Sequence, residues 1–109
     1  MAGVAALPFA AMSSDTTRVP SVIERLESAA QGDGGVRFVG HSVAPDGPTF
    51  VPWSEIHDDA RAVGAALQAR GLLPGDHVAV LGPTSRSLMT IVRGCWMAGI
   101  ASMILPAFR

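Results

Sequence analysis

The sequence predicts an α/β protein: an N-terminal helix and a β-hairpin, then a second helix, then a parallel βαβ unit. The stretch from Gly71 to Pro106 carries most of this prediction, because it places a helical pattern, Arg86 to Ala98, between two apolar runs, His77 to Leu81 and Ile100 to Leu105. Nearly continuous apolar runs are typical of parallel strands that are covered on both faces. Upstream, two segments with apolar residues at helical spacing flank a turn-rich region.

Composition narrows the class of protein. A chain of 109 residues is one domain at most, and its hydrophobic content of 49%, charged content of 16% and mean hydropathy of +0.36 are unusual for a small soluble domain. We expect either a membrane association or a part of something larger whose apolar faces meet partners. The net charge of -1 gives no electrostatic footprint for nucleic acid. No lysine is present, and the single cysteine, Cys95, fits a reducing compartment, so we expect the cytoplasm.

The first residues, Met1 to Met12, are apolar but too short to span a bilayer. They lack the basic start of a signal peptide, and Pro8 interrupts the apolar stretch. A disordered start, or true initiation at Met12, is favoured over a signal peptide. We therefore expect a flexible segment over residues 1–18 and no integral membrane segment.

The first helix and the hairpin follow from local patterns. Apolar residues from Val19 to Ala30 fall on one helical face, with Pro20 in the first turn and Gly32 at the end. The polar face is acidic, so packing against the body of the protein is favoured over lying on a membrane. Strands are predicted at residues 36–39 and 49–51, joined through the turn residues 45–48 and ended by Pro52.

The second helix is predicted to begin at Ser54 as N-cap and to end at Gly71, which supplies a left-handed cap. Its acidic first turn favours the positive end of the helix dipole. The predicted buried stripe consists of Ile56, Ala60, Val63 and Leu67. A tight turn at residues 73–76 then leads into the βαβ unit, whose helix is closed by Gly99.

Candidate sites are few. The stretch Gly82-Pro83-Thr84-Ser85-Arg86-Ser87 follows a strand and opens a helix, so an ordinary N-cap or an anion site is possible, and the cap is favoured because neither nucleotide-loop motif matches. Glu55 and Asp59 have a spacing that a metal could bridge, in a turn that also holds His57 and Asp58, but nothing nearby completes a ligand set.

Histidine and cysteine chemistry has equally little support. His41 and His77 are isolated in sequence, and Cys95 lies in an apolar helix as a small hydrophobe, without a base or an electropositive setting. We predict no catalytic, cofactor-binding or metal-binding residue in this chain.

The last helix and strand are apolar beyond what one buried stripe requires. Met89, Trp96, Met97 and Met103 spread over most of the helix circumference and onto the final strand. Such a strand at the end of a chain would leave an exposed, adhesive edge. We expect further chain or a partner to cover it.

Several stretches resemble the opening of adenylate-forming acyl ligases. They are Thr49-Phe50-Val51-Pro52-Trp53-Ser54-Glu55-Ile56, the helix from Ala60 to Gly71, and the strand entry Leu73-Pro74-Gly75-Asp76-His77-Val78-Ala79-Val80-Leu81. The helix from Leu88 to Ala98, Gly99 and the strand ending in Leu105-Pro106 are similar to the family's next helix and strand. Within the superfamily the chain is most similar to fatty-acid–CoA ligases and fatty-acyl-AMP ligases.

The resemblance implies a reaction in which a fatty-acid carboxylate attacks ATP to give an acyl-adenylate and pyrophosphate, after which a thiol accepts the acyl group. ATP, magnesium and CoA are therefore implied for a full-length relative. The family's phosphate loop ending in Pro-Lys, its Thr-Glu motif, its ribose-binding Asp and its late catalytic Lys find no match here, so no catalytic residue carries over. Residues 19–109 are then expected to be a partial N-terminal subdomain of an AMP-dependent synthetase, an N-terminal fragment that is inactive alone.

Two other interpretations remain open. The chain is a non-catalytic interaction module that docks on a full-length ligase, or it is a residual truncated gene product. The partner that we expect to cover the apolar C-terminal helix and strand is a related ligase or a downstream polypeptide.

Overall fold

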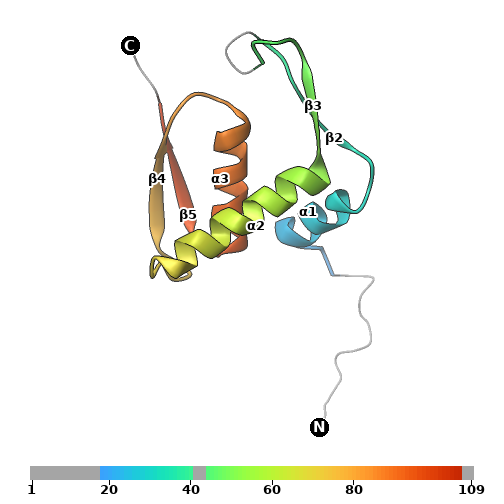
Figure 1. Ribbon diagram of the computed structural model, residues 1–109. Helices are drawn as coiled ribbons and strands as arrows, with labels where there is room; N and C mark the ends of the chain where they lie inside the picture. The colour runs from blue at the N-terminus through green and yellow to red at the C-terminus, as the bar shows by residue number, and fades with distance from the viewer. Residues whose placement is uncertain (1–17, 41–43, 107–109) are drawn as a thin grey trace.

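The computed structural model describes residues 18–40 and 44–106. Within them the elements run α1, β2, β3, α2, β4, α3, β5, as Figure 1 shows. The α/β class and the predicted order of elements are confirmed. The expectations for residues 1–17, including the start at Met12, and for His41 lie outside the described residues.

Helix α1, Val22–Ala30, begins later than the sequence pattern suggested. Ser21 is its N-cap: the Ser21 hydroxyl accepts a hydrogen bond from the Glu24 amide at 3.2 Å, and the Glu24 carboxylate accepts one from the Ser21 amide at 3.4 Å. The prediction that Pro20 lies in the first turn is wrong, because this reciprocal capping box makes Ser21 the N-cap and Val22 the first helical residue.

Strands β2, Gly35–Phe38, and β3, Thr49–Pro52, form the predicted antiparallel hairpin. The pairing begins at Gly35, which lies opposite Pro52, rather than at Val36. A Cβ at Gly35 would lie 2.4 Å from the Val51 carbonyl oxygen and 2.6 Å from the Phe50 ring. The missing side chain therefore lets the two strands meet where only glycine fits.

Helix α2, Trp53–Ala69, follows β3 with no intervening loop. Pro52 occupies the N-cap position and makes no side-chain cap bond, so the prediction that Ser54 caps this helix is wrong. The Trp53 amide instead donates to the Gly34 carbonyl at 3.0 Å, which ties the start of the helix to the hairpin. The far end matches the prediction, since Gly71 has a positive φ of 91° after the C-cap residue.

The strand–helix–strand order and the parallel pairing of the predicted βαβ unit are confirmed. Strand β4, His77–Leu81, pairs in parallel with β5, Ala101–Leu105, and helix α3, Arg86–Met97, connects them. The unit is closed at its base, because the Gly75 amide donates to the Gly99 carbonyl and the Ala101 amide donates to the Asp76 carbonyl. Gly99 has a φ of 73°, the left-handed conformation expected at the end of the helix.

The core lies mainly between α2 and α3, which make the most extensive contact between elements. Ile56 on α2 and Cys95 on α3 are the largest side chains that are fully buried among the described residues. Cys95 packs with Ala98 and Ile100 in one cluster that the partly buried side chains of Leu67, Leu72, Val78 and Ile91 surround. The predicted stripe of α2 is broadly confirmed at Ile56 and Ala60.

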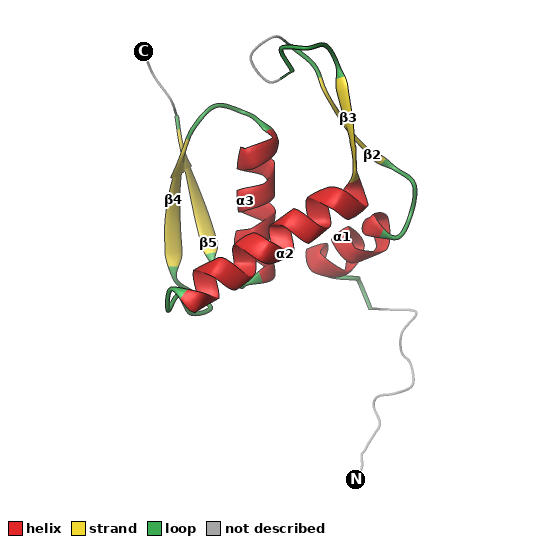
Figure 2. Ribbon diagram, in the orientation of Figure 1, coloured by secondary structure: helices red, strands yellow, loops and turns green. Residues whose placement is uncertain are grey.

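The two-stranded sheet is covered on one side only. Helix α3 lies beside it in Figure 2, and the side chains that alternate toward that side include buried Val80. The opposite face is exposed at every position: His77, Ala79, Leu81, Ala101, Met103 and Leu105. The described residues supply helices to one face of these apolar strands alone, so the cover that the apolar runs predict for the second face does not come from them.

Candidate functional site

The loop between β4 and α3 was the main candidate for an anion site. Ser85 caps α3, since its hydroxyl accepts from the Leu88 amide at 3.2 Å, and the N-cap interpretation is confirmed. Arg86 points to α2 instead of to the loop: its guanidinium donates to the Glu55 carboxylate and, at 3.0 Å, to that of Asp59. These hydrogen bonds, mainly the one that Arg86 donates to Glu55, raise the pKa of Arg86. The positive charge of Arg86 is thus used to join two helices.

The acidic turn of α2 supplies these carboxylates and does not form a metal centre in the described residues, where no group of three His, Cys, Asp or Glu side chains could hold an ion. His57 is buried against the body of the protein, and its Nδ1 has no hydrogen-bond partner among the described residues. Asp58 and His77 are exposed.

Cys95 is fully buried in α3 and is a free thiol. Burial raises the pKa of this thiol, which disfavours the nucleophilic thiolate. The structure therefore confirms the prediction of a structural cysteine.

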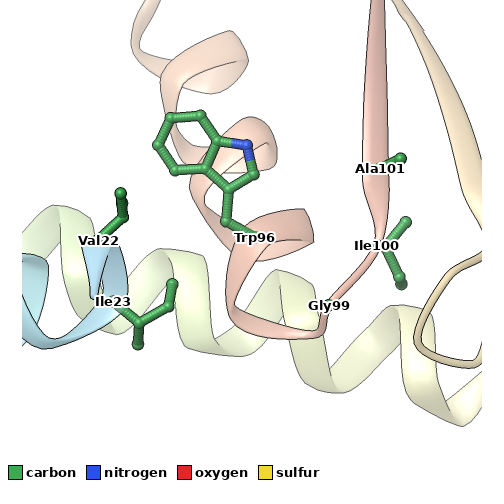
Figure 3. Close-up of a pocket in the computed structure, with 6 residues that line it drawn as sticks. All are labelled: Val22, Ile23, Trp96, Gly99, Ile100 and Ala101. Atoms are coloured by element: carbon green, nitrogen blue, oxygen red, sulfur yellow. The ribbon is translucent and has the colours of Figure 1, made fainter.

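Exposed apolar surface is the most extensive unusual feature of the chain. Besides the open face of the sheet, a hollow of about 460 Å³ lies between α1, the end of α3 and the start of β5. Figure 3 shows Trp96 standing between Ile23 and Ile100 there. The Trp96 side chain is 46% exposed, large for an indole in a folded protein. The expectation that the last helix and strand present unmatched apolar surface is confirmed.

Arg93 is a residue that the sequence analysis missed. It lies on α3 between the apolar residues Val92 and Gly94, only 6% exposed, with its guanidinium carbon 4.8 Å from the centre of the Trp53 ring. Its Nε and Nη2 atoms are buried without a hydrogen-bond partner among the described residues. Burial lowers the pKa of Arg93. The signal in the sequence is an arginine in the second half of α3, among the apolar residues Ile91, Val92 and Cys95.

Arg93 lines a second cavity of about 370 Å³, bounded by side chains from α1, β2, α2, α3 and β5. Most of the lining is apolar, with the Thr84 and Ser85 side chains at the start of α3 as polar exceptions. Arg93 is the only charged side chain in the lining of this cavity. We call it the Arg93 cavity.

Comparison with known proteins identifies the family. The model of the AMP-binding enzyme family matches residues 26–107, so the chain belongs to this family. A CoA ligase for a propanoyl-substituted methyl-dioxo-octahydroindene in Rhodococcus jostii (strain RHA1) is 32% identical over 88 residues, which is 81% of this chain and 16% of the relative. The p-hydroxybenzoic acid–AMP ligase FadD22 of Mycobacterium marinum is 37% identical over 57 residues, 52% of this chain and 8% of the relative.

Solved structures agree on the fold. The fatty acid AMP ligase from Legionella pneumophila matches with a TM-score of 0.68 at 21% identity, over 91% of this chain and 18% of that one. The adenylation domain of a keto acid-selecting NRPS module matches with a TM-score of 0.70 at 22% identity, over 86% of this chain and 18% of that one. The chain thus has the fold of one part of the adenylate-forming ligases. It spans about a sixth of the length of the Rhodococcus relative and of these two solved structures, and less of FadD22.

The described residues do not fit the ATP, magnesium and CoA that the family uses. The chain contains no lysine to hold a phosphate. Glu55 and Asp59 are already paired with Arg86. Arg93 is buried, and no second cationic side chain lines its cavity to balance the several charges of a triphosphate. Among the described residues no helix has the length and apolar character needed to cross a bilayer.

Proposed function

We propose that the chain forms the opening part of the large domain of a fatty-acid-activating, adenylate-forming ligase, and that it supplies scaffold and not chemistry. One observation carries this proposal: the family match extends over residues 26–107, in a sequence without lysine. A fatty acid AMP ligase among the structural neighbours supports fatty acids as the substrate class.

The ligase reaction would then depend on residues that this chain does not contain. ATP, magnesium and CoA would bind to the remainder of the ligase, and the chain alone would release no pyrophosphate. A free, buried thiol at Cys95 supports a reducing compartment, and we place the protein in the cytoplasm.

The open face of the sheet is the surface through which the remainder would attach. Its outward side chains are apolar or small apart from His77, and Leu81, Met103 and Leu105 are 69%, 47% and 44% exposed. Covering such a face removes apolar surface from water, which is the main favourable term in association. This observation also supports the second candidate function, a module that docks on a separate ligase.

Complementation tests the scaffold proposal. The Rhodococcus relative, shortened by the residues that match this chain, is mixed with the chain, ATP, Mg²⁺ and its own acid, and pyrophosphate release is measured. We expect release only when both polypeptides are present. The matched control is a chain with the outward residues Leu81 and Met103 changed to Glu, which should abolish release while leaving the helical circular dichroism intact.

Size-exclusion chromatography and ANS binding test whether the chain is a scaffold with an open apolar face or a free-standing domain. We expect the isolated chain to self-associate or to bind the apolar dye ANS through its open sheet face, and the L81E/M103E variant to do neither. A dispersed monomer that binds no ANS would count against attachment of a second polypeptide at this face.

A further inference from the structure

An apolar trough runs along helix α3, on the side of the sheet that this helix covers. It joins the hollow beside Ile23 to the Arg93 cavity, because Trp96 lines both. Residues of α1 stand on one side of Trp96 and residues of β5 on the other (Figure 3). We call this surface the α3 trough, and its main lining residues are Ile23 and Leu26 on α1, Met89 and Trp96 on α3, and Ile100 and Ile104 on β5.

The α3 trough exposes large apolar side chains to water. Val22 at its near end, Trp96 at its centre and Ile104 at its far end are 57%, 46% and 55% exposed. Arg93 is the only charged side chain in the lining, and its Nε and Nη2 atoms are buried away from the opening. An occupant without charge and with large apolar side chains therefore fits the trough, since it would remove this surface from water.

The chain itself contains an uncharged apolar segment of sufficient length. Residues 4–12 have no polar side chain, and Leu7, Phe9 and Met12 are large. Pro8 disfavours a helix and favours an extended backbone. These nine residues reach up to about 30 Å when extended, whereas α3, with 12 residues, is about 18 Å long. The segment is therefore long enough to cover the whole trough.

This segment is also attached at one end of the α3 trough. Arg18, the first described residue, donates a hydrogen bond to the Glu24 carboxylate on α1 at 2.6 Å, and the trough begins at Val22. The polar residues 13–17 form a tether that spans at most about 17 Å. A short tether gives an effective concentration on the order of millimolar. The chain's own segment is thus favoured over a second copy in dilute solution.

We propose that residues 4–12 occupy the α3 trough as an intramolecular cap, with Leu7 and Phe9 packed against Trp96 between the walls of α1 and β5. The cap competes with any partner of the same apolar character, so it acts as an autoinhibitory contact. A chain that starts at Met12 lacks Leu7 and Phe9 and leaves the trough open. The cap does not involve the open face of the sheet, so it is independent of the scaffold function.

The fluorescence of Trp96 reports whether the trough is covered. Because the chain has two tryptophans, Trp53→Phe leaves Trp96 as the only one in the full 109-residue chain. The decisive variant in this background is Leu7→Glu/Phe9→Glu. At pH 7 a glutamate must be neutralised to enter an apolar trough, which from a pKa of about 4.3 costs about 500-fold in the docked population. We expect stronger quenching by acrylamide and emission at longer wavelength.

The matched control is Ser13→Glu/Ser14→Glu, which adds the same two charges to the tether and removes no apolar side chain. We expect this control to have the quenching and the emission of the chain with unaltered residues 1–17. Equal quenching of Trp96 in all three chains would overturn the cap.

Photocrosslinking locates the segment and keeps the cap testable even if Trp53→Phe fails to fold. Phe9 is replaced by p-benzoylphenylalanine, which reacts preferentially with methionine, and the adducts are mapped by mass spectrometry. Met89 lies in the α3 trough, whereas Met103 lies on the open face of the sheet. We expect adducts within one chain at Met89 and its neighbours in the trough. Adducts at Met103, adducts that join two copies, or no adducts would overturn the cap.

Discussion

The close approach of α2 and α3 depends on Gly94, and its replacement by alanine tests the packing directly. A Cβ at this position would lie 2.8 Å from the Ala60 carbonyl oxygen and 2.8 Å from Val63 Cβ. Both atoms are fixed by the backbone of α2, so neither can rotate out of the way. The Gly94→Ala variant must therefore push the two helices apart.

The expected change in the free energy of unfolding of Gly94→Ala follows from two opposing effects. Overpacking a well-packed interface costs about 1–3 kcal/mol, and contacts with rigid atoms favour the upper half of that range. Alanine in place of glycine inside a helix stabilises the helix by about 1 kcal/mol. We expect a net loss of about 1–2 kcal/mol in the free energy of unfolding, a large share of the stability of so small a domain.

Gly64 provides the matched control, because it lies on the same interface with more room. A Cβ there would meet the Gly94 carbonyl oxygen at 3.2 Å and the Ala98 Cβ at 3.9 Å. The smaller steric cost should roughly cancel the gain in helix propensity, which leaves Gly64→Ala close to the unaltered chain. Urea unfolding followed by far-UV circular dichroism measures both variants. Equal midpoints for Gly94→Ala and the unaltered chain would refute the packing argument.

Three further predictions concern charge. Arg86→Met removes two half-exposed ion pairs between α2 and α3, and should lower the free energy of unfolding by less than about 1 kcal/mol in urea titrations, a loss that high salt abolishes. The hydrogen bond from Arg18 lowers the pKa of Glu24 in the folded state. This carboxylate therefore stabilises the fold above its ordinary pKa of about 4.3, and the stabilisation is lost as the pH falls through the lower pKa of the folded state. Glu24→Gln should flatten the acid limb of a profile of unfolding free energy against pH. Burial raises the pKa of the Cys95 thiol in the folded state. The stabilisation by the neutral thiol is therefore complete below the ordinary thiol pKa of about 8.5 and is lost as the pH rises through the higher pKa of the folded state. Cys95→Ala should give a shallower alkaline limb of the stability–pH profile than the unaltered chain.

Elements with a strong local signal could be predicted from the sequence. The αL glycines at positions 71 and 99 fix two helix ends because only a residue without a side chain adopts that conformation readily. Helix starts were harder to predict. Ser21 and Pro20 both suit the first turn of α1, and the reciprocal bond with Glu24 decides between them. The start of α2 depends on a tertiary contact, the bond from the Trp53 amide to Gly34, which no local pattern contains.

In the candidate site, too, local features could be predicted from the sequence and tertiary contacts could not. Cys95 and Ser85 could be assigned from their neighbours in the sequence, because burial in an apolar helix and capping are local properties. The partners of Arg86 come from a helix about thirty residues away, and only folding places them together. The cavity around Arg93 collects side chains from five elements, so the surroundings of this arginine could not be predicted from its neighbours in the sequence.

The central claim is that this chain carries the scaffold of an adenylate-forming ligase and not its chemistry. Its most direct test is pyrophosphate release by the purified chain alone, supplied with octanoate, ATP and Mg²⁺. The account predicts no release above a blank without protein. Release that rises in proportion to the concentration of the chain, and that persists through further purification, would contradict it.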